Sequence, residues 1–162
     1  MFYSTRDHLS FRFIGIPYAD PFERWTYSDV YSSAGTITAL AYGSPCTQIG
    51  YGSEDCLFLN VYTPYLPQNS ITSRNLKPVM FWIHGGAYTS GEGSDGIFDG
   101  GNLASRSDVV VVTINYRWDN MYLSRSSSSL LFSLSTLGFL ALEDGTTNGN
   151  YGIADQVSFS LY

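Results

Sequence analysis

The chain of 162 residues is long enough for one domain with a hydrophobic core, and its 44% hydrophobic and 14% charged residues exclude a disordered protein. An aromatic share of 16% indicates a packed or aromatic-lined protein. The formal net charge of −6 at pH 7 provides no basic surface for nucleic acid, so we expect no nucleic-acid partner.

No apolar segment is long enough to suggest a transmembrane helix. The longest candidate, residues 130–142, is interrupted by Ser133, Ser135, Thr136 and Gly138, and it falls short of the roughly 20 apolar residues that span a bilayer. The N-terminal stretch MFYSTRDHLSFRF lacks the basic start and the apolar segment of a signal peptide. We therefore expect either an intracellular protein or a chain whose true N-terminus is missing.

Three segments are predicted to be strands, in a chain that begins with loops. Residues 18–52 are rich in Tyr, Ser, Pro and Gly, which predicts surface loops and at most one short strand. Strands are expected at 57–63 (LFLNVYT), 79–84 (VMFWIH) and 109–116 (VVVVTINY). Their continuous apolar character is typical of a sheet buried on both faces, so we predict an α/β fold with a mostly buried mixed sheet. Between the last two strands, residues 103–107 leave room for a helical turn or two.

The two cysteines, Cys46 and Cys56, have two interpretations. Oxidised, they would close a loop of about 11 residues, worth roughly 3 kcal/mol. Reduced, they would be two thiols in the core. Their spacing does not suit a metal site, because His8 and His84 are distant in the sequence and no second cysteine pair exists, so we expect neither metal nor cofactor.

A glycine pair directly follows the second predicted strand, in the segment IHGGAYTSG at residues 83–91. Two adjacent glycines allow a sharp turn that points successive N–H groups into open space, and such groups stabilise a developing oxyanion. A plain glycine turn after a strand explains the same pattern.

Six motifs occur in a characteristic order along the chain: FIGIPYADPFERW at 13–25, GSEDCLFLNVYTP at 52–64, FWIHGGAYTSG at 81–91, VVVVTINYR at 109–117, LGFL at 137–140 and GNYGIADQ at 149–156. In this order they resemble the N-terminal third of type B carboxylesterases and lipases, the cholinesterase-like branch of the α/β-hydrolase fold. The resemblance covers nearly the whole chain. It implies that residues 1–162 are the N-terminal portion of an incomplete α/β-hydrolase domain.

The resemblance assigns roles to several positions. The backbone N–H groups of Gly86 and Ala87 are expected to be two oxyanion-hole donors, with Ala87 in place of a third glycine, and Gly85 and His84 are expected to support them. His84 is not expected to be the general base, which lies far downstream in the family. The resemblance also implies a Cys46–Cys56 disulfide and two structural ion pairs, Arg24–Glu54 and Arg117–Asp155. A disulfide implies an oxidising compartment, so we expect a secreted or extracellular parent.

The catalytic triad is expected to be absent from this chain. Hydrolysis in this family requires a G-x-S-x-G elbow, then an acidic residue and a histidine. No G-x-S-x-G occurs here, and EGSDG around Ser94 has Glu92 where glycine is required.

We expect an inactive fragment of a serine-dependent hydrolase whose parent acts on a small-molecule or lipid carboxylic ester. Two alternatives stay open: a non-catalytic cholinesterase-like binding or adhesion module, and a defective gene model. The sequence leaves the oligomeric state open.

Two segments depart from the family pattern. Deleting residues 118–133 (WDNMYLSRSSSSLLFS) restores the continuous motif NYRLSTLGFL, and SSSSLLFS has the composition of a translated pyrimidine tract. The tail at 157–162, VSFSLY, also leaves the pattern. We predict that both are retained introns; the alternative for 118–133 is a genuine surface loop, since such insertions cost little closure entropy.

A chain that stops before the nucleophile strand would leave 109–116 with an unpaired apolar edge, which predicts insolubility of the isolated chain.

Overall fold

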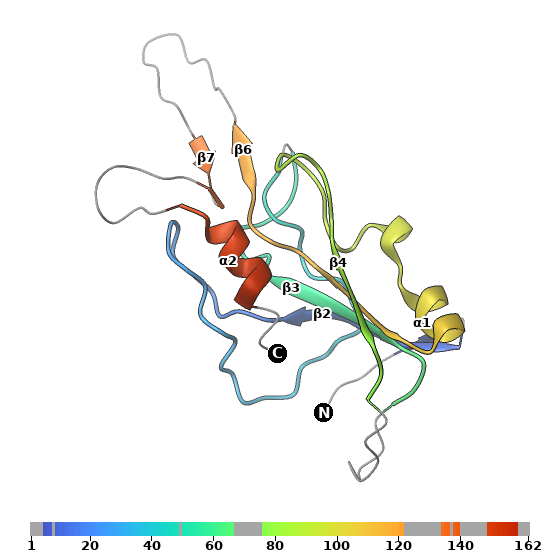
Figure 1. The fold of residues 1–162 in the computed structure, drawn as a ribbon. Coiled ribbons are helices and arrows are strands. Elements are labelled where there is room, and N and C mark those ends of the chain that lie inside the picture. The colour runs from blue at the N-terminus through green and yellow to red at the C-terminus, as the bar shows by residue number, and fades with distance from the viewer. Residues whose placement is uncertain are drawn as a thin grey trace, which may run out of the picture.

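The computed structural model describes residues 5–7, 9–48, 50–66, 76–121, 134–136, 138–139 and 149–158. The strands are β1 (Thr5–Asp7), β2 (Ser10–Pro17), β3 (Phe58–Thr63), β4 (Val79–Ile83), β5 (Val110–Ile114), β6 (Asp119–Met121) and β7 (Leu134–Thr136). The helices are the 3-10 helix η1 (Gly96–Phe98) and the α-helices α1 (Gly101–Ser107) and α2 (Tyr151–Ser158). The β6–β7 hairpin extends away from the main sheet (Figure 1).

The main sheet is mixed and has the order β1-β2-β3-β5-β4. Strands β4 and β5 are parallel, with Phe81 opposite Val112, while the other neighbours are antiparallel. The parallel pair requires a crossover, which runs through η1 and α1, and α1 packs on β2, β3 and β5. The predicted α/β fold with a mixed sheet is confirmed, and so are the three predicted strands, with ends that differ by one or two residues.

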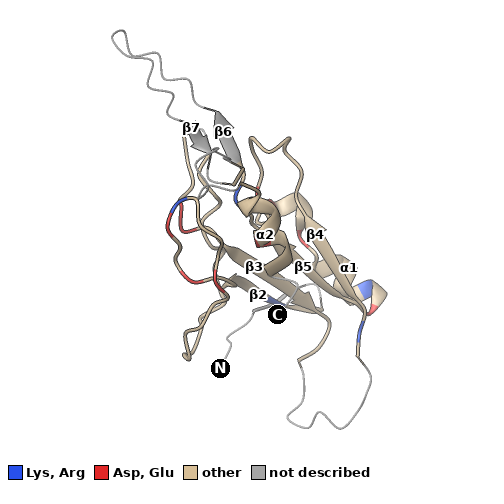
Figure 2. Cartoon of the chain, turned by 60° about the vertical axis from the view of Figure 1, so that its left-hand side comes forward, with Lys and Arg blue, Asp and Glu red and all other residues tan. Residues whose placement is uncertain are grey.

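Strand β4 differs from the sequence prediction. Residues 79–84 were expected to be buried on both faces, and 109–116 were expected to form the open edge. Instead β5 is paired on both sides, and β4 is one of the two edge strands among the described residues, with Val79 62%, Met80 46% and Trp82 45% exposed. Both expectations are wrong because apolar composition shows only that a strand can be buried, whereas the crossover decides which strand lies outside. Figure 2 shows no charged residue on β3, β4 or β5.

Strand β2 was not expected from the sequence. Its ladder with β3 is irregular between Phe13 and Ile16, where Gly15 adopts a φ of +72° and donates its N–H to Oδ1 of Asn60 at 3.0 Å. A bulge of this kind disrupts the strand pattern in the sequence, because it adds residues to one strand without a partner in the other.

The core lies between the sheet and the loop segment 18–52. The larger buried cluster contains Tyr18, Ala19, Cys46, Cys56, Leu57, Leu59, Val112, Ile114, Tyr116 and Trp118. Residues 18–52 form loops and isolated β-bridges, as predicted, but part of this segment is core rather than surface, since Tyr18 is fully buried and its hydroxyl donates to the Asn115 carbonyl at 2.7 Å.

The predicted insert at 118–133 begins with a buried residue. Trp118 is 1% exposed, and Asp119 is paired with Thr136 across β6 and β7. Residues 122–133 lie outside the described residues, and so do 159–162 of the predicted tail, whereas 157–158 complete α2. The retained introns stay a prediction, which sequencing of the spliced transcript tests.

Candidate functional site

A tight turn begins where β4 ends, and we call residues 85–91 the glycine turn. Gly86, Ala87 and Tyr88 have φ values of +132°, +51° and +58°, all in the left-handed region. A side chain at Gly86 would overlap the carbonyl oxygen of Ser90. The carbonyl oxygen of Gly86 accepts hydrogen bonds from the N–H groups of Thr89 and Ser90, at 2.9 and 3.1 Å. Left-handed backbone at non-glycine residues costs energy, and it persists only where the surrounding structure holds it.

The turn presents backbone donors to solvent. Both Gly86 and Ala87 are exposed, and within the described part of the chain their N–H groups have no hydrogen-bond partner. Backbone N–H groups are strong donors that are normally paired. Backbone N–H groups without a protein partner are the kind of donor that stabilises a negatively charged oxygen.

His84 directly precedes the turn and contacts its first residue, Gly85. Its side chain is buried, its Nδ1 lies 2.9 Å from the Gly85 carbonyl oxygen, and its ring stacks on Tyr116 at a centroid distance of 4.6 Å. Burial lowers the pKa of His84, more than the bond to Gly85 raises it, which favours the neutral imidazole. Its Nε2 is buried and has no partner among the described residues. The contacts of the His84 side chain are thus with Gly85 of the turn and with Tyr116 of the core.

Gly93, just beyond the turn, is held by buried polar side chains of the sheet. Its N–H donates to Oδ1 of Asn115 at 2.8 Å, and its carbonyl accepts from Thr113 Oγ1 at 2.7 Å and Asn60 Nδ2 at 3.3 Å. Asn115 also donates from Nδ2 to the carbonyl of Ser44 at 3.0 Å. Sequence reasoning missed this network, although polar residues inside the apolar strands LFLNVYT and VVVVTINY were its signal.

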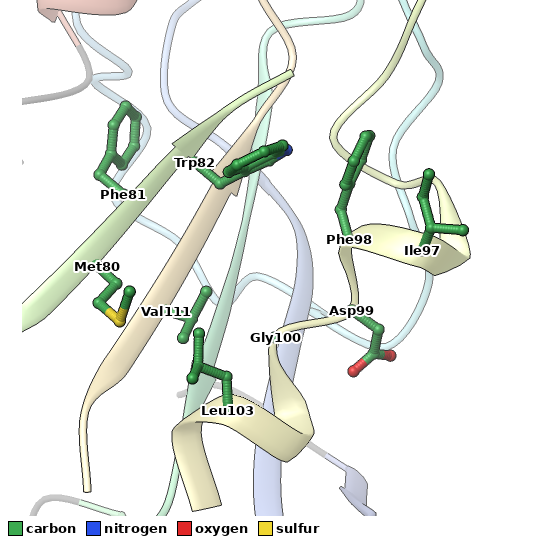
Figure 3. A pocket seen from close by; sticks show the side chains of 9 residues that line it. All are labelled: Met80, Phe81, Trp82, Ile97, Phe98, Asp99, Gly100, Leu103 and Val111. Carbon is green, nitrogen blue, oxygen red and sulfur yellow. The ribbon is translucent and has the colours of Figure 1, made fainter. Parts of the chain in front are cut away.

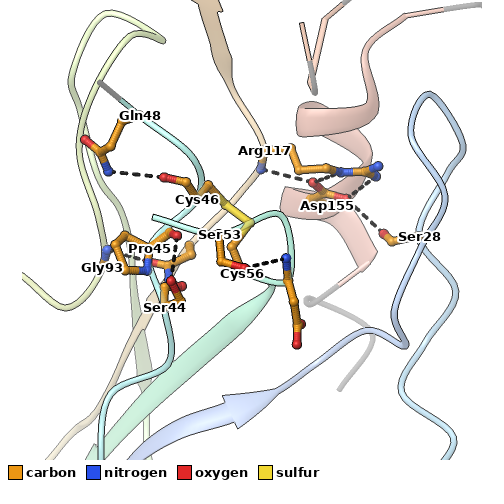
Figure 4. The surroundings of a disulfide bond; sticks show 12 residues. Ser28, Ser44, Pro45, Cys46, Gln48, Ser53, Cys56, Gly93, Arg117 and Asp155 are labelled. Atoms are coloured by element: carbon orange, nitrogen blue, oxygen red, sulfur yellow. Dashed lines mark hydrogen bonds and ion pairs between the residues drawn. A yellow bond between two sulfur atoms is a disulfide. The ribbon is translucent and has the colours of Figure 1, made fainter. Parts of the chain in front are cut away.

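The two cysteines are joined in a disulfide, with a Cα–Cα distance of 4.8 Å and a sequence separation of 10. Both are buried in the larger cluster, and Figure 4 shows their bond beside Pro45 and Ser53. Of the two interpretations that the sequence left open, the structure has the oxidised one.

The two expected ion pairs lie in different environments. Arg117 and Asp155 are fully buried, with Nη2–Oδ1 2.7 Å and Nε–Oδ2 2.8 Å apart, and Ser28 donates to the same carboxylate at 2.9 Å (Figure 4). Arg24 and Glu54 lie at the surface, where Nε donates to both carboxylate oxygens at 2.9 Å. The Arg24 hydrogen bond lowers the pKa of Glu54.

A separate apolar cavity of about 250 Å³ lies between β4 and the crossover. Figure 3 shows Trp82 of β4 facing Phe98 of η1, with a ring distance of 5.1 Å, and Leu103 of α1 below them. Its one carboxylate, Asp99, is paired with Arg12 at 2.9 Å. The cavity therefore offers apolar contact and no free acid or base.

The described residues contain no group of three or more His, Cys, Asp or Glu side chains arranged to hold a metal ion. Within the same residues, no helix has both the length and the apolar character needed to cross a membrane.

The mixed sheet, with a glycine turn at the carboxyl end of β4, is the fold of part of an α/β-hydrolase, the fold class of the solved esterases that the chain resembles. A solved carboxylesterase of Geobacillus stearothermophilus, EST55 at pH 6.8, is similar in fold, with a TM-score of 0.77 and 33% identity over 97% of this chain and 31% of that protein.

The chain belongs to the carboxylesterase family, whose model matches residues 4–159. It is 36% identical to the para-nitrobenzyl esterase of Bacillus subtilis, over 89% of this chain and 28% of that protein. It is 35% identical to the bile salt-activated lipase of Homo sapiens, over 89% of this chain and 18% of that protein. The chain thus spans less than a third of the length of these relatives.

Proposed function

We propose that the full-length protein is a serine-dependent hydrolase of a small-molecule or lipid carboxylic ester. The observation that carries this proposal is the pair of unbonded backbone N–H groups at Gly86 and Ala87, held in left-handed backbone. Membership of the carboxylesterase family supports it, as do similar proteins that bear the names of an esterase and a lipase.

In the proposed mechanism, a general base takes the hydroxyl proton of a serine outside residues 1–162 as the serine oxygen attacks the ester carbonyl carbon, and it later gives that proton to the leaving alcohol. The carbonyl oxygen becomes negatively charged and accepts hydrogen bonds from Gly86 and Ala87. Each donor of this kind contributes about 3 to 4 kcal/mol of transition-state stabilisation. Loss of the alcohol leaves an acyl-enzyme, which water then hydrolyses to the acid and the free serine. These steps require neither a metal nor a cofactor.

Residues 1–162 by themselves are proposed to be inactive, because they contain no G-x-S-x-G elbow to supply the nucleophile. The full-length protein is proposed to be secreted or extracellular. The Cys46–Cys56 disulfide supports this location, because disulfides persist in oxidising compartments.

The test compares the full-length protein with residues 1–162 alone. Both are assayed on p-nitrophenyl esters of short and long acyl chains and are treated with a fluorophosphonate that labels activated serines. We expect hydrolysis and a labelled serine outside residues 1–162 in the full-length protein, and neither in the short chain. A folded full-length protein that neither hydrolyses esters nor reacts would contradict the proposal and leave the binding or adhesion module, which no observation here favours.

A further inference from the structure

The side chain of Gln48 joins two segments that are 43 residues apart in the sequence. Its Nε2 donates to the carbonyl of Gly91 at 3.1 Å, and its Oε1 accepts from the N–H of Gly91 at 3.2 Å. Gln48 is 5% exposed, whereas Gly91 is half-buried, so the two bonds lie at the boundary of the core. The carboxamide thus binds Gly91 through a donor and an acceptor at once, as a neighbouring strand would.

Gln48 is itself held by the disulfide ring. It lies between Cys46 and Cys56, which are both buried, and its Nε2 also lies 3.4 Å from the Cys46 carbonyl (Figure 4). The Gln48 backbone exchanges two hydrogen bonds with Tyr51, at 2.9 and 3.2 Å, which closes a short turn within the ring. The position of the carboxamide is therefore set by a covalently closed loop.

Gly91 is the far end of the glycine turn and touches its near end. With a φ of +118°, it packs so closely on His84 that a side chain at Gly91 would lie 2.5 Å from Nδ1 of His84. A shift of Gly91 would therefore change its packing against His84 and Gly85, and the donors at Gly86 and Ala87 lie between Gly85 and Gly91 in the turn. Gln48 is the side chain that binds both backbone groups of Gly91.

Building on the proposed function, we propose that Gln48 is a positioning residue that holds the oxyanion donors in place by coupling Gly91 to the Cys46–Cys56 loop. Gln48 touches neither the substrate nor the reacting atoms. It acts through Gly91, and the disulfide acts through Gln48.

The first test uses Gln48→Ala in the full-length protein, with Thr47→Ala in the same loop as the matched control. We expect kcat on a p-nitrophenyl ester to fall about ten- to a hundred-fold, as for other displacements of catalytic groups by about 1 Å. KM should stay near the wild-type value, because the oxyanion contact strengthens only in the transition state. A kcat equal to that of Thr47→Ala would overturn the proposal.

The second test uses Gln48→Glu and its pH profile. The introduced carboxylate can accept from the Gly91 N–H but has no hydrogen for the Gly91 carbonyl, and protonation of the carboxyl group restores that donor. We expect kcat, divided by the wild-type value at the same pH, to rise as the pH is lowered. The ratio is measured under conditions where the variant is fully folded at every pH, because protonation of a buried carboxylate also restores stability. A flat or falling ratio would contradict the coupling.

Amide hydrogen exchange separates this proposal from the proposed function. Exchange at residues 85–91 of the full-length protein should become faster in Gln48→Ala, and also in a Cys46→Ala/Cys56→Ala variant, but not in Thr47→Ala. If the wild type hydrolyses no ester, the proposed function fails and the exchange rates still decide the role of Gln48. If the wild type is active and both exchange and kcat are unchanged in Gln48→Ala, the positioning role alone fails.

Discussion

The hydroxyl of Tyr116 donates a hydrogen bond to the backbone carbonyl of His84 at 3.0 Å, while the rings of the two residues stack. Tyr116 follows β5 and His84 follows β4, so this pair joins the ends of two parallel neighbours. The contact fixes the point at which the chain leaves the sheet and enters the glycine turn.

Removing the hydroxyl of Tyr116 should therefore destabilise the protein. In Tyr116→Phe the ring and its stacking remain, but the buried His84 carbonyl loses its partner, which costs about 1 to 3 kcal/mol. Urea denaturation followed by tryptophan fluorescence measures this loss in the full-length protein. Tyr51→Phe is the matched control because Tyr51 is 55% exposed, and equal effects of the two variants would contradict the structural role of Tyr116.

Loss of the Cys46–Cys56 disulfide should lower the free energy of unfolding by about 3 kcal/mol, since a loop this short still restricts the unfolded chain. Reduction with dithiothreitol and the Cys46→Ala/Cys56→Ala variant should give the same result in urea denaturation. Because the double variant has no Cys46–Cys56 disulfide to reduce, dithiothreitol should not lower its free energy of unfolding by this route. Unchanged stability after both thiols are shown to be free would disprove this estimate.

The two ion pairs should respond very differently to removal of one partner. Arg117→Met leaves the buried carboxylate of Asp155 uncompensated, which costs about 3 to 5 kcal/mol. The same change at the exposed pair, Arg24→Met, should cost less than about 1 kcal/mol because water screens the charges. Adding Asp155→Leu to Arg117→Met should recover much of the loss, and failure to recover any would show that packing rather than charge is responsible.

The protonation of His84 should couple folding to pH. Burial lowers the pKa of His84 in the folded protein, so the unfolded chain binds the proton more readily. This contribution to stability is fully present above the unfolded pKa of about 6.5 and is lost as the pH falls below it. His84→Asn should remove this part of the pH dependence, measured as the difference in unfolding free energy from wild type. A difference that does not vary with pH would contradict a lowered pKa of His84. The variant His8→Asn shows how much of the pH dependence of stability comes from the other histidine of this chain.

Residues 1–162 expressed alone should associate or remain molten. The open edge of β4 and the exposed side chains of Val79, Met80 and Trp82 offer an uncharged strand to another molecule. Size-exclusion chromatography and dye binding should detect the association, and Val79→Lys with Trp82→Lys should reduce it. A wild-type chain that is a soluble monomer with a sharp, cooperative melt would contradict this prediction.

Much of the site could be predicted from local signals. IHGGAYTSG placed a glycine turn after a strand, and three apolar segments gave three strands of the sheet. The supports of the turn were missed, because Gln48 and Asn115 meet residues 91–93 only after segments far apart in the sequence have paired. Strand β2 was missed for a related reason, since its bulge at Gly15 interrupts the local pattern.

By itself the sequence determined three strand segments, the position of the turn and, through motif order, the carboxylesterase family. Only the tertiary structure decided that β4 is the open edge, that one ion pair is buried and the other exposed, and that a disulfide loop reaches the glycine turn through Gln48. Strand and turn preferences arise from neighbouring residues, whereas burial and long-range pairing depend on which distant segments the fold brings together.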